Sequence, residues 1–124
     1  MAGHQGFVLG VGFSPDDERL YSRSIEGDIH VWDPALKVRL AVWQGCHRGQ
    51  ILSLAIASTG EVVSAGLDGT IGIWSPGGDL NRRLSGHQAG VHGVAANDAL
   101  VASASADWRI GLWRRGTGEL VRCL

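Results

Sequence analysis

The sequence predicts an all-β protein of three similar units, each with four antiparallel strands. Its main signal is a repeat, because His, Ser, an acidic residue and Trp recur in this order three times. The three Trp residues of the repeat, Trp32, Trp74 and Trp113, are 42 and 39 residues apart. Short apolar segments also alternate with turn signals, and 19 Gly but only 3 Pro suit many strands and tight turns. A period of about 40 residues is typical of stacked repeat units.

The repeated residues divide the chain into three consecutive units. We expect these units to span residues 1–44, 45–85 and 86–124. The repeated positions are His4, Ser22, Glu26 and Trp32 in the first unit, His47, Ser64, Asp68 and Trp74 in the second, and His87, Ser103, Asp107 and Trp113 in the third.

The first half of each unit is predicted to form two strands. Apolar, β-branched residues follow each repeated His in segments too short for helices, which favours buried strands. Turn residues such as Ser14-Pro15-Asp16-Asp17 then separate the first strand from the second. The predicted first strands are 7–13, 50–57 and 90–96, and the second strands are 19–24, 61–66 and 100–105.

The second half of each unit begins with a tight turn that contains the repeated acid. Gly27 and Gly69 follow this acid in two units, and Trp108 takes the place of that Gly in the third. An Asp-Gly pair between two β segments is a strong hairpin signal. The last strand of each unit is more polar, which marks an outer edge. The third strands are predicted at 29–32, 70–74 and 109–113, and the fourth at 37–43, 80–84 and 119–124.

Charge and composition argue against several classes of partner and location. The net charge is −1 and the Arg residues are scattered, so we expect no binding to nucleic acid. No segment approaches the roughly 18 apolar residues of a membrane span, and no signal peptide is visible, so we expect no membrane association and no secretion. Cys46 and Cys123 make no disulfide framework, which favours the cytoplasm or the nucleus.

The repeat resembles the WD-repeat β-propeller family. The Trp-Asp pair of the family appears as Trp32-Asp33, and its turn motif appears as Phe13-Ser14-Pro15-Asp16. The resemblance covers essentially the whole chain and implies three four-stranded antiparallel blades. Since closed propellers have 4–8 blades, we expect a β-propeller segment, an incomplete ring with two uncovered blade faces. Glu26 in place of Asp, and the split Gly45-Cys46-His47, predict weaker hydrogen-bond networks in blades one and two.

The resemblance also implies that the repeated His, Ser, acid and Trp form a structural hydrogen-bond network in each blade. A buried Trp N–H needs an acceptor, and a Ser hydroxyl bridged to His and a carboxylate supplies one. The same residue types could form a catalytic triad, but no Gly-x-Ser-x-Gly elbow is present and a triad in triplicate suits no single active site. Cys46-His47 and His87 with His92 lack the spacing of a zinc site. We therefore expect no enzyme activity, no cofactor and no bound metal.

Partners are expected on the loops at one edge of the blades. Trp108 with Arg109 has the composition of an interface hot spot, and the alternative is that Trp108 covers a neighbouring blade. The chain is therefore interpreted as a scaffold that presents loop residues to a protein or peptide. The alternative is a purely structural segment that completes a larger propeller, or a ring of identical copies by self-association. The candidate binding residues are Phe7, Ile25, Arg48, Leu67, Trp108 and Arg109.

Overall fold

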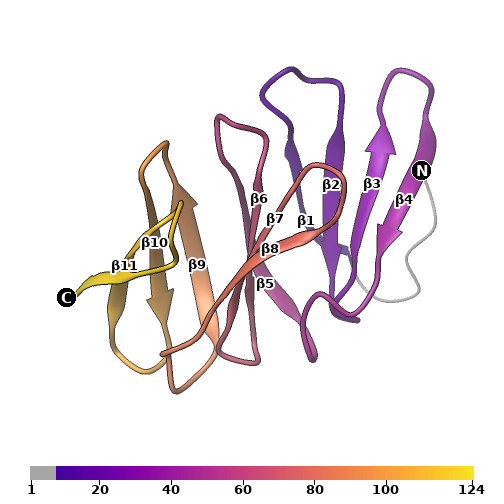
Figure 1. Ribbon diagram of the computed structural model, residues 1–124. Coiled ribbons are helices and arrows are strands. Elements are labelled where there is room, and N and C mark those ends of the chain that lie inside the picture. Colours follow the sequence, from indigo (N-terminus) through magenta and orange to yellow (C-terminus); the bar gives the residue numbers. More distant parts are fainter. Residues whose placement is uncertain (1–7) are drawn as a thin grey trace.

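The computed structural model describes residues 8–124 and contains three four-stranded antiparallel sheets, called blades 1, 2 and 3 here (Figure 1). Strands and turns make up the described residues, and no helix there is long and apolar enough to cross a membrane. Blade 1 has β1 (Val8–Phe13), β2 (Leu20–Ser24), β3 (Ile29–Asp33) and β4 (Val38–Trp43). Blade 2 has β5 (Ile51–Ile56), β6 (Val62–Gly66), β7 (Ile71–Trp74) and β8 (Leu80–Leu84). Blade 3 has β9 (Val91–Ala96), β10 (Leu100–Ser105), β11 (Ile110–Arg114) and β12 (Leu120–Cys123).

Strand order within each sheet follows the chain, so every blade is a simple meander. The three sheets stand side by side in sequence order, with blades 1 and 3 at opposite ends (Figure 1). The predicted all-β fold of three antiparallel four-stranded blades in an unclosed row is confirmed. The predicted strands differ from the observed ones by about one residue at their ends, because backbone pairing rather than side-chain type sets each end.

The apolar core lies between the blades rather than inside one sheet. Each blade buries one face against the next, so the two junctions hold nearly all of the large buried side chains. The junction of blades 1 and 2 is built from Tyr21, Ile29, Val31, Trp43, Cys46, Ile51, Val62 and Trp74. The junction of blades 2 and 3 is built from Val63, Ala65, Ile71, Ile73, Leu84, Val91, Val101 and Trp113.

A register shift recurs in the pair of third and fourth strands of every blade. It falls between Val31 and Trp32 in blade 1, and at the corresponding step before Trp74 and Trp113 in the other two blades. Such a β-bulge changes the direction of the following side chain. In every blade, the register shift therefore comes directly before the Trp whose indole belongs to the repeated hydrogen-bond network.

Candidate functional site

In blade 2 the four repeated residues lie together in one hydrogen-bonded chain. Trp74 Nε1–H donates to Ser64 Oγ at 2.8 Å, and Ser64 Oγ lies 2.7 Å from His47 Nε2. The other ring nitrogen, His47 Nδ1, lies 3.0 Å from Asp68 Oδ1. Since the carboxylate only accepts, His47 donates through Nδ1 and accepts the Ser64 hydroxyl proton through Nε2. The chain ties the loop before β5 to the β6–β7 turn and to the blade interior.

Blade 3 repeats this arrangement. Trp113 Nε1–H donates to Ser103 Oγ at 2.9 Å, and His87 Nε2 lies 2.7 Å from the same oxygen. His87 Nδ1 lies 2.8 Å from Asp107 Oδ2. Backbone N–H groups of Gln88 and Arg109 also donate to Asp107, so this carboxylate fixes both the inter-blade loop and the β10–β11 turn.

Blade 1 is described in part, because His4 lies outside the described residues. Trp32 Nε1–H donates to Ser22 Oγ at 2.9 Å, as in the other blades. His30 stands where Gly72 and Gly111 stand in blades 2 and 3, and its ring stacks on Trp32 with 6.0 Å between ring centroids. This His was missed by sequence reasoning, which compared only the four repeated positions.

The hydrogen-bond chain of blade 2 is complete despite the split Gly45-Cys46-His47, and the prediction that this network is weaker than that of blade 3 stays a prediction. The extra residue that separates Gly45 from His47 is Cys46, whose side chain is fully buried between the blades. The Cys46 thiol donates to the carbonyl oxygen of Trp43 at 3.1 Å, so the insertion is absorbed in the loop. Burial raises the pKa of Cys46 to about 12, so the thiol stays protonated and unreactive at neutral pH.

The electrostatics of the network keep its carboxylates ionised and its buried His neutral. Burial lowers the pKa of His47, because the charged imidazolium loses solvation. Burial alone would raise the pKa of Asp107, but hydrogen bonds from His87 and from backbone N–H groups outweigh it and hold that pKa at about 2. Asp68 shows the same balance and its pKa is also lowered. These charges therefore serve as fixed hydrogen-bond acceptors at neutral pH.

The seryl oxygens of the network are not placed for attack on a substrate. Ser64 is 0 % exposed and Ser103 is 2 % exposed. Each oxygen is already bonded to an indole N–H and a His ring nitrogen. A catalytic Ser needs an accessible Oγ beside an oxyanion hole, so the geometry favours the structural interpretation over a triad.

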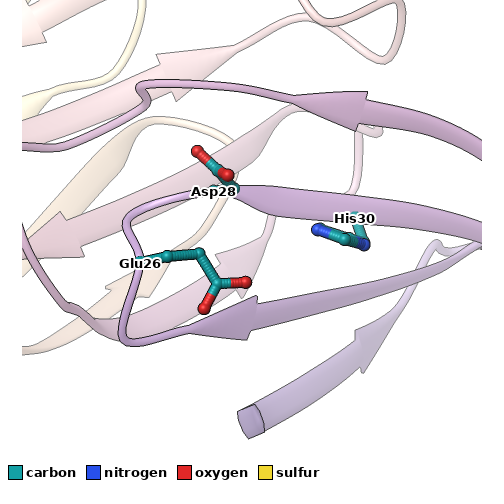
Figure 2. Close-up of side chains that lie close together, drawn as sticks. All are labelled: Glu26, Asp28 and His30. Atoms are coloured by element: carbon teal, nitrogen blue, oxygen red, sulfur yellow. The ribbon is translucent and has the colours of Figure 1, made fainter. Parts of the chain in front are cut away.

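Three potential metal ligands lie close together at the β2–β3 turn (Figure 2). One ligand atom from each of Glu26, Asp28 and His30 falls within 4.8 Å of the others. However, Asp28 Oδ1 accepts the Gly45 N–H at 2.8 Å, and Glu26 and His30 also have further interactions. A structural zinc ion takes four ligands, whereas this group has three, and each of the three side chains has other interactions. That the chain binds no metal therefore stays a prediction.

The turns between second and third strands and the inter-blade loops meet at one edge, which we call the loop edge. Ala106 N–H donates to the Gly90 carbonyl at 3.0 Å, and Leu67 N–H donates to Gln50 at 2.9 Å, so turn and loop are bonded in blades 2 and 3. His47 N–H donates to the Gly27 carbonyl, which joins the turn of blade 1 to the next loop.

The candidate binding residues on the loop edge differ in exposure. Trp108 is 96 % exposed and Leu67 is 51 % exposed, while Ile25 is half-buried. Arg48 and Arg109 are exposed. Phe7 lies outside the described residues. At 96 % exposure Trp108 covers no blade among residues 8–124, so the alternative that it packs on a neighbouring blade of this chain is wrong for the described structure.

Trp108 also has an unusual backbone conformation. Its φ is 72°, in the left-handed region, and Gly27 and Gly69 hold the same position in blades 1 and 2 with φ of 87° and 82°. Those glycines lie against the following blade, since a Cβ at Gly27 would lie 2.4 Å from the His47 carbonyl oxygen. The described chain has no blade after blade 3, so Trp108 meets no such obstacle.

A similar replacement occurs at the opposite end of the row of blades. Lys37, in the β3–β4 turn, has φ of 57°, where Gly78 and Gly118 stand in blades 2 and 3. Those two glycines pack on the preceding blade, against Trp43 and Leu84 respectively. Aligning the turns of the three repeats would have revealed Lys37, which sequence reasoning missed.

Comparison with known proteins places this repeat in a family. The family described as "WD domain, G-beta repeat", WD40, matches residues 1–33, 38–75 and 78–114. The chain belongs to the WD40 family. Solved WD40 structures share its fold: that titled "Structure of U3-55K" superimposes on 99 % of this chain with a TM-score of 0.92 and 25 % identity. The chain covers 40 % of that structure.

Curated relatives are longer proteins. Telomerase protein component 1 of Mus musculus is 30 % identical over 97 % of this chain, which covers 5 % of that relative. Periodic tryptophan protein 2 of Arabidopsis thaliana is 34 % identical over 96 % of this chain, which covers 14 % of it. A ribosome biogenesis protein YTM1 of Coccidioides immitis is 28 % identical over 86 % of this chain and 24 % of its own length. This chain therefore spans a small part of each of these relatives.

Proposed function

We propose that this WD40 chain is a non-enzymatic scaffold that binds a protein or peptide through its loop edge, with Trp108 as the anchor. WD40 propellers generally act as interaction scaffolds, and the relatives named for telomerase and ribosome biogenesis suit a role in larger assemblies. Those names also favour the nucleus within the proposed location in the cytoplasm or nucleus. The scattered basic residues favour a protein partner over nucleic acid.

The observation that carries this proposal is the conformation and exposure of Trp108. A left-handed backbone costs a residue other than Gly about 1–2 kcal/mol. At 96 % exposure, the indole gains almost no burial within the described chain to offset that cost. A partner that buried the indole would remove about 150–250 Å² from water, worth roughly 4–6 kcal/mol at about 25 cal/mol per Å².

The neighbours of Trp108 fit a hot spot. Arg109 follows it and is exposed, and its backbone N–H is fixed by Asp107, so the pair stands on a rigid turn. An indole beside a guanidinium suits a partner segment that offers an apolar side chain next to a carboxylate. Because the turn is rigid, less conformational entropy is lost when a partner binds, and this increases the affinity.

The test is capture of partners by photo-crosslinking and mass spectrometry with wild type and two variants. Trp108→Ala should lose the partner, because it removes the indole and leaves the backbone φ unchanged. Leu36→Ala is the control, since Leu36 is 70 % exposed and lies in the β3–β4 turn rather than on the loop edge. Retention of every specific partner by Trp108→Ala would refute the proposal.

The second candidate is a structural role, in which the chain completes a larger propeller or a ring of identical copies. The observation in its favour is that apolar side chains are exposed at both ends of the row of blades, at Val11, Phe13 and Ile110 among others. The two candidates predict different things of the purified chain: the first a specific partner, the second association of blades.

A further inference from the structure

The face of blade 3 that continues the row is a third copy of a surface that is buried twice within the chain. Strand register gives two matching sets of positions on this surface. They are Ile29, Ile71 and Ile110 on the third strands, and Trp43, Leu84 and Leu124 opposite them. Ile29 and Ile71 are 0 % exposed, but Ile110 is 46 % exposed. Leu84 is 3 % exposed, but Leu124 is 60 % exposed. We call Ala102, Ala104, Ile110, Leu112 and Leu124 the tail face.

Blade 1 carries the complementary surface at the other end. Its first-strand residues Val11 and Phe13 are 63 % and 55 % exposed. The matching residues of blade 2, Leu54 and Ile56, pack against the junction with blade 1, and those of blade 3 pack against the junction with blade 2. We call Val11, Phe13 and Leu20 the head face; Trp32 is only 5 % exposed although the described chain has no blade before it, so it is left out.

The two faces lie on blades at opposite ends of the row (Figure 1). We infer that the tail face of one copy binds the head face of a second copy in the register of the two internal junctions. Two copies then form two equal junctions and a ring of six blades, within the 4–8 blades of closed propellers. This inference develops the structural role and does not depend on the partner proposed for Trp108.

The internal junctions show what each face accepts. At each internal junction, the surface that corresponds to the tail face packs against two residues of the next blade, an aliphatic residue of its second strand and its network Trp. These are Val62 and Trp74 at the junction of blades 1 and 2, and Val101 and Trp113 at the junction of blades 2 and 3. Blade 1 has Leu20 and Trp32 at these positions, and Leu20 is the more exposed of the two because Trp32 is only 5 % exposed. The second copy therefore brings the residue types that already cover this surface within the chain, and a net charge of −1 opposes pairing little.

The replaced turn glycines decide how tightly the copies fit. Within the chain, a Cβ at Gly118 of blade 3 would lie 3.1 Å from Leu84 Cδ2 of blade 2. Between two copies, Lys37 takes the place of Gly118 and Leu124 takes the place of Leu84. Leu124 is a flexible side chain that can shift to make room for Lys37. Trp108 is the tighter point. A Cβ at the corresponding Gly69 would lie 3.2 Å from the Ala89 carbonyl oxygen, and a Cβ at Gly27 would lie 2.4 Å from that of His47. In the register of either junction, the Cβ of Trp108 therefore requires a shift of the backbone around it. The segment before β1 that would face it in the second copy lies outside the described residues. Trp108→Gly should therefore tighten the pair.

The experiment measures the mass of the purified 124-residue chain by sedimentation velocity across a concentration series. Wild type should reach twice the 13.1 kDa mass of one chain. Ile110→Asp on the tail and Phe13→Asp on the head should each weaken pairing by about 30-fold or more, as for a central interface residue. Leu124→Asp repeats the tail test at the chain end, where a loss of fold is least expected. Leu36→Asp, at a residue that is 70 % exposed but lies on neither face, should pair like wild type.

Mixing the variants tests the head-to-tail geometry. A Phe13→Asp copy and an Ile110→Asp copy keep one intact tail and one intact head between them, so their mixture should pair more tightly than either alone. A monomer at every concentration, or a mixture no tighter than its components, would overturn the inference. A ladder of masses beyond the dimer would overturn the closed ring. If Trp108→Gly lost pairing, two copies would not bind in the register of the internal junctions. If Trp108→Gly lost only the protein partner and still paired, that result would bear on the proposed function and not on this inference.

Discussion

The clearest quantitative consequence of the structure concerns Ser64, the centre of the hydrogen-bond network in blade 2. Ser64→Ala removes a fully buried oxygen that accepts from Trp74 Nε1–H and donates to His47 Nε2. Both partners stay buried, at 7 % and 5 % exposure, and neither gains water. Leaving a buried donor or acceptor without a partner costs about 1–3 kcal/mol, so the two together cost about 3 kcal/mol of unfolding free energy.

The assay is urea unfolding followed by Trp fluorescence, with thermal unfolding as a second readout. A loss of about 3 kcal/mol corresponds to a melting temperature lower by roughly 10 °C in a chain of this size. Ser85→Ala is the matched control, because Ser85 is exposed and the same change there should stay within about 0.5 kcal/mol. A loss below about 1 kcal/mol for Ser64→Ala would show that the network does not brace the blade.

Three further outcomes are expected. Acid should destabilise the protein through Asp107, because its folded pKa of about 2 lies below its unfolded value. The stability that Asp107 contributes is complete above about pH 4 and disappears as the pH falls toward 2. Urea unfolding at several pH values should show that Asp107→Asn makes the unfolding free energy fall less steeply with decreasing pH. Trp108→Gly should raise the unfolding free energy by about 0.5–1 kcal/mol, since relief of the left-handed strain exceeds the added chain entropy, and Trp108→Ala should not match this gain in the same assay. Neither EDTA nor added Zn²⁺ should shift the melting temperature, and a shift that Glu26→Gln abolishes would identify the turn of blade 1 as a metal site.

Much of the fold could be predicted because the information is local and repeated. The Trp period set the number of blades, and alternating apolar segments set strands that the structure places within about one residue. Pairing of Ser64 with Trp74 followed from the need of a buried indole N–H for an acceptor. The place of Cys46 could not be predicted, because an insertion in sequence does not show whether a loop can absorb it.

The sequence by itself determined the repeat, the all-β class and the four residues that are hydrogen-bonded together in blades 2 and 3, because each depends on spacing within one blade. Only the tertiary structure decided which residues lack a neighbour. Ile71 and Ile110 occupy the same place in their repeats, yet one is fully buried and the other 46 % exposed. Trp108 and Lys37 likewise stand where neighbouring blades require Gly elsewhere in the chain. Whether a residue is buried depends on the neighbouring blade, and the sequence pattern within one blade carries no information about that neighbour.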